Sequence, residues 1–141
     1  MAMPRTPLLT TDCVICDSDG RVLLIRRRNE PFKGAYALPG GFVDIGETVE
    51  AACRREVLEE TGLAVDELHL IDVFSDPRRD PRGHTVSIAY MTHLPRAPNP
   101  KVGSDAEAAE WVEDWRTLEL AFDHAEIIAD AEKLVRIHRQ K

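Results

Sequence analysis

The sequence predicts one α+β domain in which two helices pack on a central β-sheet. Its length of 141 residues is the size of a single domain, so we expect one domain over residues 1–141. Short apolar and β-branched runs bounded by turn residues predict strands and hairpins, and two segments carry the spacing of a helix. With 43% apolar residues, the chain has enough hydrophobic side chains for one core.

The predicted strands and loops follow one another along the chain. The strand runs are residues 10–16, 22–25, 68–74, 85–93 and 109–113. The turn cluster 17–20 joins the first two runs, which predicts a hairpin. The segments between the other runs are rich in proline, glycine or charge and predict loops at residues 29–34, 37–41, 75–83 and 95–103.

Two segments, residues 48–61 and 124–138, carry helix patterns. Thr48 suits the N-cap of the first helix, and Gly62 suits the left-handed position after its last turn. Asp123 and Glu126 have the spacing of a capping box at the start of the second helix. Its apolar residues repeat at helical spacing, which predicts a face packed on the core: Ile127, Ile128, Ala131, Leu134 and Val135.

Charge and composition narrow the classes of partner. The 18 basic and 25 acidic residues give a net charge of −7, which argues against broad nucleic-acid binding. No apolar run approaches the roughly 20 residues that span a bilayer, and residues 1–7 lack the apolar stretch of a secretory signal. We therefore expect a cytoplasmic protein with no membrane or nucleic-acid partner. The sequence leaves the oligomeric state open, with a homodimer as one alternative.

The three cysteines predict core positions and no disulfide framework. They are few and odd in number, which is typical of a reducing compartment. Cys13 and Cys16 have the spacing of a zinc or redox pair, but three residues apart on a strand they point to opposite faces. We interpret them as small hydrophobic core residues.

Three glutamates interrupt the apolar face of the first helix. Glu56, Glu59 and Glu60 stand at i, i+3 and i+4, so their Cβ atoms are neighbours about 5–6 Å apart. Two ionised carboxylates about 5.5 Å apart repel by about 3 kcal/mol at an effective dielectric constant of about 20. Water, an arginine such as Arg55, or a hard cation such as Mg²⁺ or Mn²⁺ could offset this repulsion. On the helix alone, a solvated acidic face, pairing with arginine and a metal site all remain open.

The segment around these glutamates resembles the Nudix box. Residues 41–63 contain, in order, Gly41, five residues, Glu47, seven residues and the pair Arg55-Glu56. An apolar residue, any residue, the pair Glu59-Glu60, any residue, Gly62 and an apolar residue complete the pattern, so every specified position is filled. The resemblance implies a Nudix-type α/β/α sandwich and a hydrolase that cuts a diphosphate linkage in a nucleoside diphosphate derivative.

The resemblance also implies a role for each residue of the box. Glu56, Glu59 and Glu60 would bind Mg²⁺ or Mn²⁺ together with the carbonyl of Gly40. Arg55 and Glu47 would orient the carboxylates, with an ordinary surface ion pair as the alternative. Backbone geometry would require Gly41 and Gly62. A cation is also what the chemistry needs, because the acidic cluster alone would repel a diphosphate.

Nudix proteins often use a further acidic residue outside the box as metal ligand or general base. The candidates are Asp105, Glu107 and Glu110. Asp105 ranks first because it lies six residues before Trp111, on the loop that enters a predicted strand. The alternative is a solvated loop carboxylate.

The loop at residues 75–84 resembles the corresponding loop of the ADP-ribose pyrophosphatase branch. Pro77 and Pro81 lie near the proline that this branch tends to carry. Arg79 and Arg82 are candidate phosphate or ribose contacts, with a solvated charged loop as the alternative. Arg27 and Phe32 flank the expected entrance as further candidate substrate contacts. Of the five histidines, only His84 in this loop has a functional interpretation.

The leading prediction is therefore hydrolysis of ADP-ribose to AMP and ribose 5-phosphate. A second enzyme class remains open, a nucleoside-triphosphate pyrophosphohydrolase that removes damaged nucleotides such as 8-oxo-dGTP. A third alternative is a non-catalytic ADP-ribose sensor. In each case the expected partner is a small nucleotide-like diphosphate.

Overall fold

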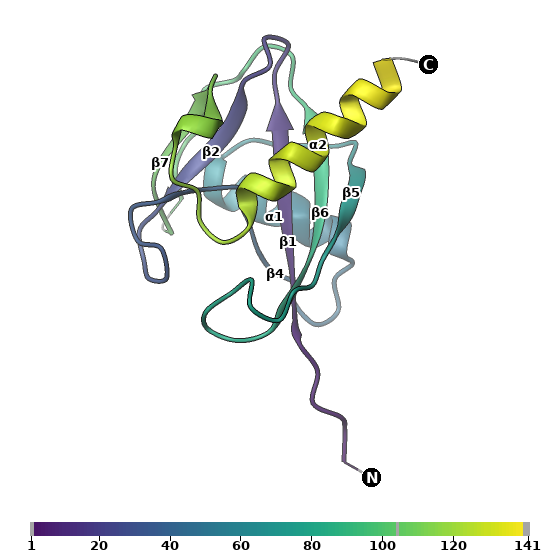
Figure 1. Ribbon diagram of the computed structural model, residues 1–141. Helices are drawn as coiled ribbons and strands as arrows, with labels where there is room; N and C mark the ends of the chain where they lie inside the picture. The colour runs from purple at the N-terminus through teal and green to yellow at the C-terminus, as the bar shows by residue number, and fades with distance from the viewer. Residues whose placement is uncertain (1, 104, 140–141) are drawn as a thin grey trace.

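The computed structural model describes residues 2–103 and 105–139 as a β-sheet with one α-helix on each face. In Figure 1, α2 crosses the front of the sheet and α1 lies behind it. The predicted α+β class, a mixed sheet between helices, is confirmed. The elements in order are β1 (Leu8–Cys16), β2 (Val22–Arg27), β3 (Tyr36–Ala37), β4 (Gly40–Phe42), α1 (Val49–Thr61), β5 (His69–Phe74), β6 (Thr85–His93), β7 (Ala106–Val112), the 3₁₀ helix η1 (Trp115–Thr117) and α2 (His124–Arg139).

Strand β1 is the centre of the sheet. It runs parallel to β6 along its whole length, and β5 pairs with the far side of β6. Its other edge is shared by two antiparallel partners, β4 at Thr10–Asp12 and β2 at Cys16. Strands β3 and β7 then pair with β2. Because β2 and β4 meet opposite ends of one strand edge, the sheet opens between them.

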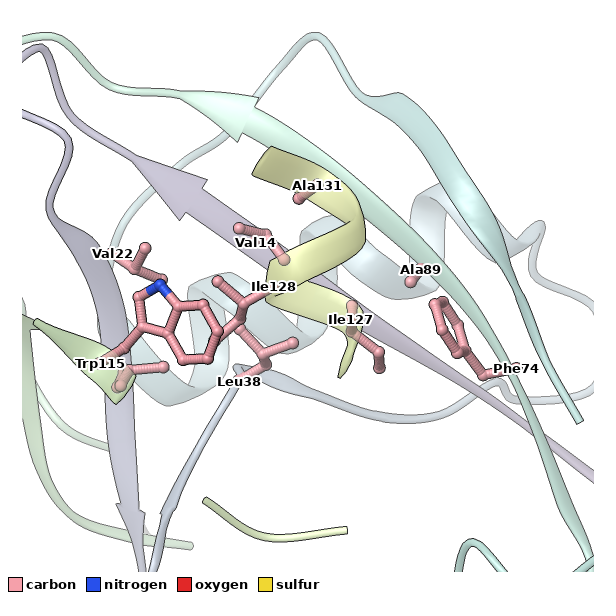
Figure 2. Packing of buried hydrophobic residues seen from close by; sticks show 10 residues of the cluster. Val14, Val22, Leu38, Phe74, Ala89, Trp115, Ile127, Ile128 and Ala131 are labelled. Atoms are coloured by element: carbon pink, nitrogen blue, oxygen red, sulfur yellow. The ribbon is translucent and has the colours of Figure 1, made fainter. Parts of the chain in front are cut away.

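Alternating residues of β1 contact the two helices. Val14 packs in the cluster beneath α2, together with Ile127, Ile128 and Trp115 (Figure 2). Cys13 and Ile15 pack in the cluster beneath α1. Cys16 packs on the α2 side, so the two cysteines of the C-x-x-C spacing lie on opposite faces. Both are free thiols, as their interpretation as core residues requires.

Local structure departs from the predictions at three places. Strands β3 and β4 form around the proline and glycines that were expected to exclude strands, because β4 gains hydrogen-bonding partners on β1 and β3 gains them on β2. Strand β7 begins at Ala106, three residues early, because it pairs with β2 up to Arg27. The predicted capping box before α2 is wrong, since the Asp123 carboxylate accepts two hydrogen bonds from Arg79 instead.

The ends of α1 agree with the sequence. The hydroxyl of Thr48 accepts a hydrogen bond from the N–H of Ala51, and Gly62 adopts a left-handed conformation with φ of 71°. Within the described ranges, no helix combines the length and the apolar character needed to cross a membrane.

Candidate active site

A cavity of about 350 Å³ lies where the sheet opens between β2 and β4. Its walls come from α1, β1, β2, β4, the loop at 75–84, the start of β7 and the start of α2. A larger and mostly apolar groove of about 660 Å³ lies between the turn after β1, β6 and α2, but its lining contains none of the predicted site residues. The smaller cavity is therefore the candidate site. Its charged lining residues are Asp12, Arg27, Glu30, Asp44, Glu56, Glu60, Arg79, Asp80, Arg82, Asp105 and, when protonated, His124.

Helix α1 places two of the three predicted glutamates in this cavity. Glu60 is buried, and its Oε1 accepts a long hydrogen bond of 3.4 Å from the N–H of Gly40. Its Oε2 is buried with no hydrogen-bond partner among the described residues. Burial and the negative charge of Glu56 raise the pKa of Glu60 to about 9. Burial also raises the pKa of Glu56. The site therefore favours a proton or a cation between these two carboxylates.

Glu59 lies on the solvent side of the same helix. Its side chain is 58% exposed, and its carboxylate accepts a hydrogen bond from Arg55 at 3.2 Å. It lies outside the lining of the cavity. In residues 2–103 and 105–139, no three carboxylate, imidazole or thiol groups converge as a ready-made metal cluster. The structure thus brings Glu56 and Glu60 together and leaves Glu59 apart.

Arg55 links the turn before α1 to the glutamates on it. It donates two hydrogen bonds to Glu47, at 2.7 and 3.1 Å, and one to Glu56 at 2.8 Å. A further bond reaches the carbonyl of Phe42 at 3.1 Å. The hydrogen bonds from Arg55 lower the pKa of Glu47. The structure thus joins Glu47, Arg55 and Glu56 in one set of hydrogen bonds.

Gly41 of β4 allows Glu56 to approach the strand. A Cβ atom on Gly41 would lie 2.6 Å from the carboxyl carbon of Glu56. Gly40 lies opposite Asp12 on β1. The pairs on either side, Pro39 with Cys13 and Gly41 with Thr11, stand at the hydrogen-bonded positions of the ladder, since the N–H of Cys13 donates to the carbonyl of Pro39. Gly40 is therefore in a non-hydrogen-bonded pair, so its N–H and its carbonyl both point away from β1, on the side of Glu60.

Asp105 is the one of the three further acidic candidates that lines the cavity. It lies just before β7, is exposed, and its carbonyl accepts a hydrogen bond from the N–H of Arg28 at 3.4 Å. Glu107 and Glu110 lie on β7 outside the lining, and Glu110 accepts a hydrogen bond from the hydroxyl of Tyr36. Asp105 therefore lines the same cavity as Glu56 and Glu60.

Two of the predicted substrate contacts present guanidinium groups to the cavity. Arg27 and Arg82 lie 5.1 and 5.7 Å from the ring centre of Phe122. Arg82 also donates to the buried carboxylate of Asp80, and Arg27 donates to the carbonyl of Pro31. Phe32 is 37% exposed and contacts Phe122 edge to face at 4.8 Å, outside the cavity lining.

Arg79 is a buried ion-pair partner. Its side chain is 5% exposed and forms a bidentate pair with Asp123, with distances of 2.7 and 2.9 Å. A further donor group reaches the hydroxyl of Thr85 at 2.9 Å. The solvated-loop alternative is therefore wrong for Arg79. Its main contacts attach the loop at 75–84 to α2 and β6, although it also lines the cavity.

The family model of the NUDIX domain matches residues 6–136, which is most of the chain. The chain belongs to the Nudix family. It is 48% identical over 124 residues to the ADP-ribose pyrophosphatase of Methanocaldococcus jannaschii, covering 88% of this chain and 72% of that relative. It is 35% identical to the ADPR responsive transcriptional repressor NtrR of Acinetobacter baylyi, covering 89% of this chain but only 53% of the repressor.

Solved Nudix structures share this fold. A MutT/nudix family protein from Enterococcus faecalis superposes with a TM-score of 0.88 at 33% identity, covering 96% of this chain and 64% of that one. The NUDIX domain of Shewanella oneidensis NrtR, crystallised with ADP ribose, gives 0.86 at 29% identity and covers 93% and 90% of the two chains.

Several cavity residues lie outside the Nudix box and were not expected from the sequence. They are Asp12 on β1, Asp80 in the loop, and Phe122 and His124 at the start of α2. Burial would raise the pKa of Asp12, but the His124 ring, the hydroxyl of Ser87 and Arg79 together lower it. A charged residue inside the apolar run of β1 was the one available signal. Nothing local in the sequence indicates His124, whose partners lie far along the chain.

Proposed function

We propose that this Nudix protein is a divalent-metal-dependent hydrolase that cuts the diphosphate linkage of ADP-ribose, giving AMP and ribose 5-phosphate. The observation that carries the proposal is the buried, unpaired Oε2 of Glu60 beside Glu56, in a cavity that also presents arginines. Such a site holds acidic groups for a cation and basic groups for a phosphorylated substrate. The 48% identity to an ADP-ribose pyrophosphatase supports this choice of substrate.

The donor set fits Mg²⁺ or Mn²⁺, which prefer carboxylate and carbonyl oxygens. Glu56, Glu60 and the carbonyl of Gly40 are the groups that would hold the ion. Glu59 is exposed, and its partner among the described residues is Arg55, so its side chain is able to turn toward them. When bound, a divalent ion neutralises phosphate charge and lowers the pKa of a coordinated water.

The residues around the acidic pair would bind and orient the substrate. Arg27 and Arg82 offer planar N–H donors to phosphate or ribose oxygens. Asp105, exposed at the edge of the cavity, would accept the proton of the attacking water. Arg55 holds Glu56 through its hydrogen bond, and Glu47 fixes Arg55 in turn. In-line attack at phosphorus needs this positioning more than a covalent nucleophile.

A substrate panel with Mg²⁺ or Mn²⁺ tests the proposal. We expect ADP-ribose to give the highest kcat/KM among ADP-ribose, NADH, diadenosine polyphosphates and 8-oxo-dGTP, and EDTA to abolish turnover. A large preference for 8-oxo-dGTP would instead assign the nucleotide-sanitising class. Turnover that persists in EDTA would contradict the metal requirement.

A second candidate function is an ADP-ribose sensor. It is favoured by the NtrR relative and by the NUDIX domain of Shewanella NrtR that was crystallised with ADP ribose. The same panel separates the two functions, because a sensor binds ADP-ribose without releasing AMP. We give priority to the enzyme because Glu56, Glu59 and Glu60 are all present. For partners we propose a small nucleotide-like diphosphate and, with a net charge of −7, no nucleic acid.

A further inference from the structure

A buried polar network lies where a Cβ on Gly40 would be, and two of its members, Asp12 and His124, also line the cavity. His124, the first residue of α2, accepts a hydrogen bond on Nδ1 from the backbone N–H of Leu38 at 3.0 Å. Its Nε2 lies 3.3 Å from Oδ1 of Asp12 on β1. An Nδ1 that accepts a hydrogen bond carries no proton, so the neutral ring holds its proton on Nε2, toward Asp12.

The second carboxylate oxygen of Asp12, Oδ2, is held by two further residues. Ser87 on β6 donates a hydrogen bond to Oδ2 of Asp12, and Arg79 lies 3.8 Å from the same atom. The orientation of the His124 ring is therefore set by a side chain on the central strand, which is held in turn by its neighbours. Asp12 and His124 are both at least nine-tenths buried, so water does not compete for these bonds.

Through the hydrogen bond between His124 and the N–H of Leu38, the network reaches the backbone just before Gly40. The segment of Leu38, Pro39 and Gly40 is held at each residue: Leu38 donates to His124, Pro39 accepts from Cys13, and Gly40 donates to Glu60. On the Asp12 side there is no spare room, since a Cβ on Gly40 would lie 2.7 Å from Oδ1 of Asp12. The bond from Gly40 to Glu60 is long, so a small displacement of this backbone breaks it.

We infer that Asp12 and His124 are positioning residues, which hold the backbone of Leu38 to Gly40 and thereby place the Gly40 carbonyl and the Glu60 carboxylate in the cavity. Neither residue belongs to the Nudix box. The inference rests on the proposed function in that the positioned groups are the proposed metal ligands. Groups that orient metal ligands change metal affinity or activity by roughly 10- to 100-fold when they are replaced.

Two substitutions of His124 separate its hydrogen bond with Leu38 from its contact with Asp12. In His124→Asn, the amide oxygen takes the place of Nδ1 and can still accept from Leu38, while the contact with Asp12 is lost. In His124→Gln, the amide nitrogen takes the place of Nε2 and can still donate to Asp12, while Leu38 loses its acceptor. The exposed His69→Gln on β5 is a matched control for the second change.

We expect His124→Gln to weaken Mn²⁺ binding, measured by electron paramagnetic resonance, and to lower kcat for ADP-ribose, each by roughly 10- to 100-fold. The change in KM should be smaller. Amide hydrogen exchange at Leu38 and Gly40 should speed up in this variant. His124→Asn should exchange more slowly than His124→Gln and recover part of the Mn²⁺ affinity, because it keeps the bond to Leu38 but has lost the contact with Asp12. This ranking should hold even if both variants melt at lower temperatures than the wild type.

Losses of Mn²⁺ affinity that are equal in the two variants and follow their melting temperatures would overturn the inference, since they indicate a merely structural role. Unchanged exchange at Leu38 and Gly40 in His124→Gln would overturn it as well. Exchange and Mn²⁺ affinity need no substrate. A wild-type protein that does not hydrolyse ADP-ribose would therefore refute the proposed function while leaving this inference measurable.

Discussion

Glu60 is the residue at which the stability of the fold and the function of the site conflict most directly. A helix face that begins as core with Ala52 and Cys53 ends with this buried carboxylate, one oxygen of which has no partner in the described chain. Burying an ionised group without a partner is strongly unfavourable, so the group either keeps its proton or binds a cation. The raised pKa of Glu60 favours the first outcome in the metal-free protein, and the second is the one a hydrolase needs.

The positions of the three glutamates predict unequal effects of substitution. Glu56→Gln and Glu60→Gln should lower kcat by on the order of 10²-fold or more, because they remove charge that faces the cavity. Glu59→Gln should have a smaller effect, since Glu59 lies outside and must move to take part. Steady-state kinetics with Mg²⁺ would test this ranking, which would be wrong if Glu59→Gln were the most damaging of the three.

Asp105 provides a test of the proton acceptor. Asp105→Asn keeps the size of the side chain but removes its basicity, so we expect kcat to fall by roughly 10²- to 10⁴-fold. The matched control is Glu107→Gln, two residues further along and outside the cavity lining, which should change kcat little. Turnover near that of the wild type in Asp105→Asn would remove this residue from the mechanism.

The sequence predicts those site residues whose spacing is local. Glu56 and Glu60 were expected from their places in the Nudix box, and Asp105 from the further acidic residue that the resemblance implies on a loop next to a strand. Asp12 and His124 could not be predicted in this way. They are 112 positions apart in the sequence and meet only because β1 passes beneath the start of α2. Arg79 was expected near the substrate, but its bidentate pairing depends on Asp123, which seemed to be a helix cap.

At the scale of elements, the loop at 75–84 is held in place by buried charge. Arg79 joins it to α2 through Asp123 and to β6 through Thr85. Arg79→Ala leaves the carboxylates of Asp123 and Asp12 without this cation, so we expect the free energy of unfolding to fall by about 3–5 kcal/mol.

The neighbouring residue gives a control for this loop. Arg78 is 92% exposed, so Arg78→Ala should change the free energy of unfolding by less than about 0.5 kcal/mol. Denaturant unfolding curves of the two variants provide the comparison. Equal, small changes would show that the ion pair of Arg79 and Asp123 does not hold the loop.

Helices and long strands were predictable because their signals are periodic and local. Both helices begin within one residue of the predicted position, and β6 agrees at both ends. The short strands β3 and β4 were not predictable, since their only support is pairing with β2 and β1. These strands carry the Leu38–Gly40 segment to the cavity. The sequence alone therefore could not predict the part of the site that forms through pairing between strands distant in the chain.

At the scale of the whole molecule, the acidic site couples stability to pH. Glu60 has a pKa of about 9 in the folded protein against an ordinary value of 4.5. Between these values the folded state keeps a proton that the unfolded chain has released. The free energy of unfolding of the metal-free protein should therefore fall as pH rises through this window. Asp12 and Asp80, whose pKa values are lowered on folding, act in the opposite sense and withdraw stability only in acid, below about pH 4.

A divalent cation should reverse this dependence, because it binds the deprotonated form of Glu60 and so competes with the proton. Apparent Mn²⁺ affinity should rise with pH by up to about tenfold per unit between pH 6 and pH 8, with close to one proton released per ion. Melting curves should then show little stabilisation by Mn²⁺ near pH 5.5 and a clear rise in Tm at pH 8. Glu60→Gln removes the titrating group, so the melting curves of this variant should depend little on either pH or Mn²⁺.

Calorimetry in buffers of different ionisation enthalpy counts the protons released when Mn²⁺ binds. A wild-type protein that binds Mn²⁺ equally well at pH 6 and pH 8, without proton release, would show that Glu60 is ionised before the metal arrives. The unpaired Oε2 would then not be the feature that the cation satisfies.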